Sequence, residues 1–199
     1  MDVSLSTILE ATISNDKNQL QNAQRYLEDA AAKNLSLFLL ELSKELVDQT
    51  KSGIVRMAAG LQLKNYLTSK DESLRFEFRQ RWLAAEEHVR VQVKSNILQT
   101  LGTEQFRPSS AAQVIAAIGC AELPEGQWPE LINSLLGFIT VNSHSENLKE
   151  ASLEALGEDF LLFIILAKLS VHFTNGLDYI YFHIHHHRFR DVHYFRALE

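Results

Sequence analysis

The most conspicuous chemical grouping in the sequence is a run of imidazoles near the carboxyl end. The run from His183 to His187 reads HIHHH. Clustered imidazoles can bind zinc, copper or nickel. No cysteine or carboxylate accompanies the run at the spacing of a structural metal site, and clustering alone is a weak signal. We therefore predict no metal site.

Other groups that could carry out chemistry are few. Cys120 is the only cysteine, and it lies in an alanine-rich stretch where it is interpreted as a small core residue. The sequence offers no nucleophile paired with a base, no glycine loop to cradle a phosphate and no metalloenzyme helix. We therefore expect neither an enzyme nor a bound cofactor.

Three glutamates form a possible acidic stripe. Glu150, Glu154 and Glu158 are spaced four residues apart, so they share one side of a helix. The stripe is either a solvated surface or a patch for a basic partner, and the sequence leaves both interpretations open.

The charge balance excludes some partners. The net charge is −6, and the stretch from Asp159 to Glu199 contains four acidic and four basic residues, so the whole excess of negative charge precedes it. Neutralising phosphates requires a basic face, so we expect no nucleic-acid partner. The apolar run from Phe160 to Ala167 is well short of the roughly 20 residues that a membrane-spanning helix needs. With one cysteine and no apolar leader, we expect a reducing compartment, the cytosol.

The elements that must position any binding residues are helices. Proline and glycine are scarce, and apolar residues recur at spacings of three and four nearly throughout. Asn34, for example, is placed to cap a helix, and Gly102 to end one. Ser14 or Asn15 is expected to cap the second helix. The expected helical stretches are 3–13, 14–33, 35–47, 52–67, a charged pair within 74–101, 107–123, 128–140 and 146–158.

These helices form a repeat. Leu27, Leu63, Ile118 and Leu156 fall at matching places in successive second helices, separated by 36, 55 and 38 residues. An inserted charged helix between Thr68 and Arg90 would explain the long interval, leaving a period of roughly 40 that is typical of HEAT repeats. About four hairpins would then stack into an all-α solenoid. The alternative is a plain helical bundle.

The helix from Ser52 to Leu67 is apolar on most of its surface, which indicates packing on several sides. Its narrow polar strip consists of Arg56, Gly60 and Lys64. We expect this strip to point away from the packed faces.

Several stretches resemble the importin-beta (karyopherin beta) family. They run from Ile8 to Gly157 and include VRMAAGLQLKNYLTSKD, QRWLAAEE and LGTEQFRPSSAAQVIAAIGCAELPEGQWPELI. The resemblance implies a non-enzymatic nuclear import receptor, shuttling between cytoplasm and nucleus, whose amino-terminal HEAT repeats bind the GTPase Ran in its GTP form. In that family the second helices line the Ran-binding side. Carried onto this sequence, the partner-binding candidates are Lys64, Asn65, Lys70 and Gln113.

The resemblance stops after Gly157. We therefore divide the chain into repeats, 1–157, and a divergent non-repeat tail, 158–199. The regions with which the family binds the importin-alpha adaptor, cargo and FG nucleoporins lie further along, so we expect them to be missing here. The tail is expected to cover the apolar end of the last repeat. The alternative function is a truncated, non-functional structural fragment or a generic HEAT-repeat scaffold for protein interactions.

Overall fold

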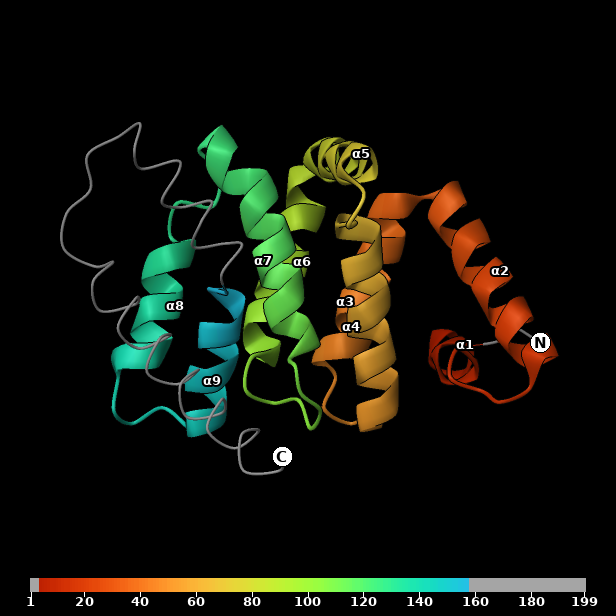
Figure 1. Ribbon diagram of the computed structural model, residues 1–199, viewed down its shortest axis with the longest axis horizontal. Coiled ribbons are helices and arrows are strands. Elements are labelled where there is room, and N and C mark those ends of the chain that lie inside the picture. Colours follow the sequence, from red (N-terminus) through yellow and green to blue (C-terminus); the bar gives the residue numbers. More distant parts are fainter. Residues whose placement is uncertain (1–3, 158–199) are drawn as a thin grey trace, which may run out of the picture. The chain divides into compact units, whose positions relative to one another are not determined.

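The computed structural model describes residues 4–157 of the chain. Within that range the structure contains nine α-helices, one short 3₁₀ helix and no strand, as expected for an all-α chain (Figure 1). The helices are α1 (Leu5–Ala11), α2 (Lys17–Lys33), α3 (Leu35–Val47), α4 (Gly53–Leu67), α5 (Glu72–Leu83), α6 (Glu87–Thr100), α7 (Ser110–Glu122), α8 (Leu131–Thr140) and α9 (Glu146–Ala155), with η1 (Leu123–Glu125) after α7.

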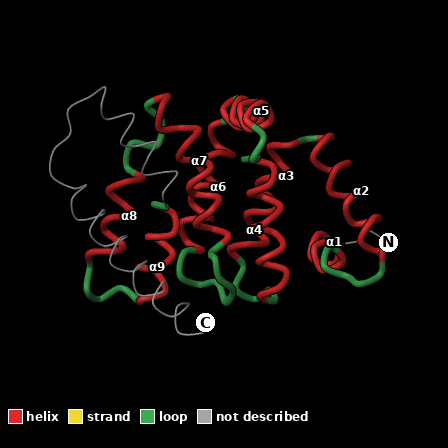
Figure 2. Tube along the Cα trace, viewed as in Figure 1, coloured by secondary structure: helices red, strands yellow, loops and turns green. Residues whose placement is uncertain are grey.

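Eight of the described helices form four consecutive hairpins, joined by the loops visible in Figure 2. We call them repeat 1 (α1, α2), repeat 2 (α3, α4), repeat 3 (α6, α7) and repeat 4 (α8, α9). The first helices of repeats 2 and 3, α3 and α6, pack against each other. The second helices pack in the same way, α4 against α7 and α7 against α9. This is the stacking of a HEAT solenoid, so the predicted architecture is confirmed.

Helix α5 is the inserted element. It packs against α4 and α7, and Figure 1 shows it nearly end-on while α4, α6 and α7 run in the plane of the view. The insertion lengthens the interval between second helices while keeping their register. Leu27, Leu63, Ile118 and Leu156 are all almost completely buried, as the repeat prediction requires.

Side chains at the helix starts fix most of the boundaries. Asn34 Oδ1 accepts the amide N–H of Leu37, which confirms the predicted cap of α3. The predicted cap of α2 was wrong, because Asp16 Oδ1 accepts the amides of Asn18 and Gln19 and so begins the helix two residues later than Ser14. Within repeat 3, Gly102 between α6 and α7 has φ +74°, the left-handed stop predicted after α6.

The expectations about membrane spans and metal sites can be compared with the structure only for the described residues. No helix within the described range is long and apolar enough to cross a membrane. The described range also holds no group of three His, Cys, Asp or Glu residues that could bind a metal ion. The histidine run, the domain boundary at residue 157 and the covering role of the tail involve residues outside the described range and stay predictions.

Candidate partner-binding surface

Helix α4 carries two of the four candidate residues, but its polar strip does not lie as predicted. Arg56 is only 6% exposed and Gly60 is buried, so both face a neighbouring element instead of solvent. The Arg56 guanidinium donates to the Leu46 carbonyl at 2.8 Å and to the carbonyl and hydroxyl oxygens of Thr103 at 3.0 and 2.6 Å. The prediction that this strip points away from packed faces was therefore wrong for Arg56 and Gly60.

Burial has an electrostatic consequence for Arg56. It lowers the pKa of the guanidinium below its ordinary value, while the carboxylate of Glu104 opposes that shift. An arginine nevertheless stays charged in a protein. The side chain is thus a buried cation that joins α3 to the loop between α6 and α7.

The exposed side of α4 is formed by different residues. Ile54 and Leu61 are 40% and 46% exposed, and Asn65 is exposed one turn after Leu61. Residues seven apart share a helix face, so these positions form a single surface. Lys64 is half-buried at the edge of that surface, and the exposed Lys70 lies in the loop that follows α4. The exposed surface of α4 is therefore mixed apolar and basic.

Helix α7 contributes Gln113. Gln113, Ala116, Ala117 and Cys120 are the half-buried positions of a helix whose other residues are buried. Gln113 is the only long polar side chain on this side. Because α7 packs against α4 as the next second helix, all four candidates lie on two adjoining helices or the loop after the first. Within the described range, none of the four makes a side-chain hydrogen bond or ion pair.

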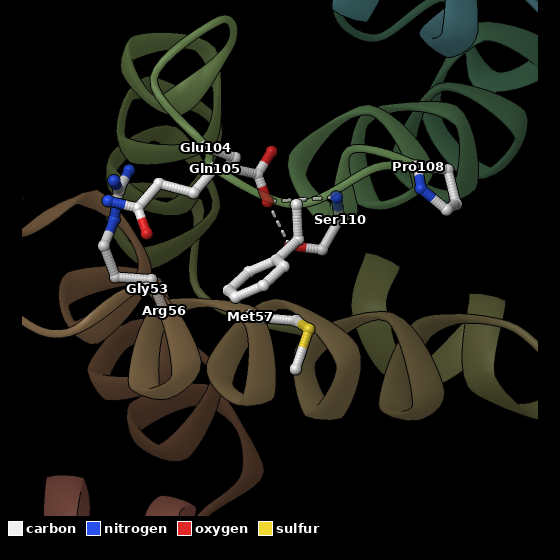
Figure 3. Close-up of a pocket in the computed structure, with 8 residues that line it drawn as sticks. Gly53, Arg56, Met57, Glu104, Gln105, Pro108 and Ser110 are labelled. Carbon is white, nitrogen blue, oxygen red and sulfur yellow. Dashed lines mark hydrogen bonds between the residues drawn. The ribbon is translucent and has the colours of Figure 1, made fainter.

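The start of α7 is held by carboxylates from two repeats. Figure 3 shows Glu104 of the preceding loop directed at Ser110. Its carboxylate accepts the amides of Ser110 and Ala111 at 3.0 and 3.2 Å and the hydroxyls of Ser109 and Ser110. Glu154 of α9 accepts the Ser109 amide at 2.7 Å. These acidic groups face the positive end of the helix dipole, so the position of α7 is fixed by charge as well as by packing.

The same loop encloses a small cavity above α4 (Figure 3). Its volume is about 10 Å³, which is room for about one water molecule. Close packing continues along α4, where a Cβ atom on Gly60 would lie 2.0 Å from Ser110 Oγ. This region is a tight junction between repeats 2 and 3.

A buried charge network joins the inserted helix to repeat 3. Glu122, fully buried at the end of α7, accepts Trp82 Nε1 of α5 at 3.1 Å. It also pairs with Arg90 at 3.0 Å and Lys94 at 2.6 Å, both on α6. Lys94 lies 5.0 Å from the ring centre of Trp128. A buried carboxylate with these partners anchors α5 and α6 to α7.

The proposed acidic stripe is partly engaged within the chain. Glu150 pairs with Arg107 at 3.5 Å, and Glu154 caps α7. Glu158 lies outside the described residues. The first two carboxylates are exposed, as a solvated stripe requires, and they also contribute to the contact between repeats 3 and 4.

Comparison with known proteins places these helices in a family. Residues 23–103 match the model of the importin-beta N-terminal domain. Importin subunit beta-1 of Schizosaccharomyces pombe is 38% identical over 150 residues, which is 75% of this chain and 17% of the relative. The repeats of this chain belong to the importin-beta family. The chain spans less than a fifth of the length of this importin beta relative.

Solved importin beta structures share the fold. "Crystal Structure of Importin Beta in an Ammonium Sulfate Condition" superposes with a TM-score of 0.73 at 31% identity, covering 84% of this chain and 20% of that one. "Kap95p Binding Induces the Switch Loops of RanGDP to adopt the GTP-bound Conformation: Implications for Nuclear Import Complex Assembly Dynamics" superposes with a TM-score of 0.71 at 31% identity, covering 86% and 21%. The array is thus similar to importin beta in sequence and in fold.

Some residues that shape this importin-beta surface escaped the sequence analysis. Glu104 and Glu122 were not singled out, although Glu122 is the only charged residue of α7, a helix whose other residues are mostly small or apolar. Arg56 was noticed but assigned to the solvent side. The signal that could have indicated its burial is that Arg56 is a single arginine on a helix expected to be packed on several sides.

Proposed function

We propose that this chain is part of a nuclear transport receptor of the importin-beta type and binds Ran through the second helices of its repeats. The observation that supports this most is the adjoining placement of the exposed side of α4 and the half-buried side of α7 that carries Gln113, in repeats that belong to the importin-beta family. A related structure, that of Kap95p, is described as acting on the switch loops of RanGDP. The chain would bind and release a protein partner and catalyse no reaction.

The chemistry of the surface suits a protein partner with an acidic, partly apolar contact region. Ile54 and Leu61 offer apolar area, and Lys64 and Lys70 offer two cations at its edge. An interface with apolar anchors and charged residues at the rim is the usual arrangement for specific protein recognition. Gln113 would supply a hydrogen-bonding group on the neighbouring helix.

The function as a whole is tested by binding Ran loaded with either nucleotide to the immobilised full chain. We expect a higher affinity for Ran-GTP than for Ran-GDP, because the bound partner in the Kap95p structure is described as adopting the GTP-bound conformation. Equal binding to both forms, or none, would contradict the proposal. It would leave the alternatives of a truncated structural fragment or a generic HEAT-repeat scaffold.

The residue assignment is tested by charge reversal. Lys64→Glu should weaken Ran-GTP binding by about tenfold, since a rim charge facing an acidic partner would become repulsive. The matched control is Lys44→Glu on α3, because Lys44 pairs only with Glu41 on its own helix and lies outside α4 and α7. Equal loss of binding in both variants would reject the assignment of Lys64 to the interface.

The cellular role follows from the family. We propose that the parent receptor shuttles between the cytoplasm and the nucleus. Importin-alpha, cargo and FG nucleoporins would be partners of the longer family members, through regions beyond those matched here.

A further inference from the structure

The polar part of the contact between repeats 3 and 4 joins exposed side chains to backbone groups, although Ser109 itself is fully buried. The Ser109 amide donates to Glu154 Oε2 at 2.7 Å, and Arg107 Nη2 donates to the Asn147 carbonyl at 3.2 Å. Glu154 belongs to the exposed residues, and the side chain of Glu150, which pairs with Arg107, is 58% exposed. The exposed side chains of Arg107 and Glu154 can bond to water instead when the helices move apart.

The apolar part of the same contact is smooth. On α9 the buried residues are Ala151, Ser152 and Ala155, whose side chains are small. The α9 backbone also comes very close to the preceding loop, because a Cβ atom on Gly102 would lie 2.7 Å from Leu148 Cα. Small side chains interlock less deeply than large ones, so a helix packed through them can slide or tilt with little repacking.

We propose that the junction of repeats 3 and 4 is a hinge, and that Glu154 is the positioning residue that latches it. A carboxylate that accepts a backbone amide at a helix start makes a strong hydrogen bond, but at an exposed site salt weakens the electrostatic part of it. With the latch closed, α9 is held at one angle to α7. With it open, repeat 4 turns about the close contact at Gly102.

The hinge would act on partner binding, and this consequence rests on the proposed function. The exposed side of α4 and the half-buried side of α7 are joined by the buried junction of repeats 2 and 3, whereas α9 meets α7 at the junction of repeats 3 and 4, where Glu150 and Arg107 pair at the surface. Glu154 would therefore set whether a partner seated on α4 and α7 also meets α9. It acts through the Ser109 amide and has no contact with the partner in this scheme.

The latch is tested by amide hydrogen exchange of the full chain, measured by NMR without any partner. Glu154→Ala should speed exchange of the Ser109 amide by about tenfold, because the capping acceptor is lost. Glu154→Gln, which keeps a neutral acceptor, should give a smaller increase. The Ala111 amide, held by Glu104, should exchange as before, and the surface control Glu41→Ala should change neither amide. Unchanged exchange at Ser109 in Glu154→Ala would overturn the latch.

The hinge itself is tested by a distance measurement between spin labels on either side of the junction. Labels at the exposed positions Gln80 on α5 and Asn133 on α8, in a chain with Cys120→Ala, report on repeat 4 relative to repeat 3. We expect a narrow distance distribution that broadens in Glu154→Ala and, without mutation, at high salt. The Glu41→Ala control should stay narrow.

The outcomes separate the two proposals. If Ser109 exchange rises in Glu154→Ala while the distance distribution stays narrow, Glu154 is only a helix cap and the hinge is rejected. Neither measurement includes Ran, so failure here leaves the binding proposal standing, and failure of Ran binding leaves the hinge standing.

Discussion

The two junctions that follow repeat 2 use similar chemical groups in opposite surroundings. Between repeats 2 and 3, the bonds of Arg56 to Leu46 and Thr103 and the bond from Asn96 Nδ2 to Ser43 Oγ involve side chains that are nearly inaccessible to water. Between repeats 3 and 4, the bonding side chains of Glu154 and Arg107 are exposed, although the Ser109 amide that Glu154 accepts belongs to a buried residue. Breaking a buried polar bond leaves a group without a partner, whereas an exposed group finds water. The first junction should therefore be rigid and the second adjustable.

The largest effect is expected where a buried charge supports repeat 3. Glu122→Ala removes the shared partner of Arg90, Lys94 and Trp82 and should lower the free energy of unfolding by about 3–5 kcal/mol, the usual cost of breaking a buried ion pair. Urea denaturation followed by circular dichroism measures it. The control is Glu125→Ala, which breaks an exposed pair with Arg79 and should cost less than about 1 kcal/mol. Similar losses in the two variants would contradict the importance given to burial.

A second test compares two glycines within helices. Gly60→Ala at the junction of repeats 2 and 3 should destabilise the chain by about 1–3 kcal/mol, because the new Cβ atom would overlap Ser110. Gly137→Ala in α8 would place its new Cβ more than 4 Å from any atom of another described element and should stabilise the chain by up to about 1 kcal/mol through helix propensity. Thermal unfolding of both variants gives the comparison. A stabilised Gly60→Ala variant would show that the junction is looser than described.

The smallest effect is expected at the exposed junction. Arg107→Ala removes the pair with Glu150 and the bond to the Asn147 carbonyl, and it should change the free energy of unfolding by no more than about 0.5 kcal/mol. Chemical denaturation is sufficient to measure this. A loss above about 2 kcal/mol would mean that the two junctions do not differ in the way their exposure indicates.

Periodicity was enough to predict most of the fold. The apolar spacing predicted the pairing of helices, and the long interval between Leu63 and Ile118 predicted the inserted helix that the structure shows as α5. These features depend on local preferences and on repetition within the chain. The cap at Asn34 and the stop at Gly102 are likewise set by residues within one turn of the helix end.

The surface was harder to predict because its polar groups depend on distant partners. Arg56 has the same position in the helical pattern whether it faces water or Thr103, which follows 47 residues later in the chain. The loop from Thr103 to Ser110 packs against Arg56 and Gly60, so these two positions of the expected polar strip are buried at the junction of repeats 2 and 3. Lys64, Asn65, Lys70 and Gln113 came from the family resemblance, and their role in binding stays a prediction.

The measurement that tests the central claim most directly is a hydrogen-exchange footprint of the full chain with and without Ran-GTP. Binding through the second helices predicts slower exchange in α4, the loop containing Lys70, and α7 around Gln113. The first helices α3 and α6 should exchange as they do in the free chain. Protection confined to α3 and α6, or no protection at a saturating concentration of Ran-GTP, would contradict the claim.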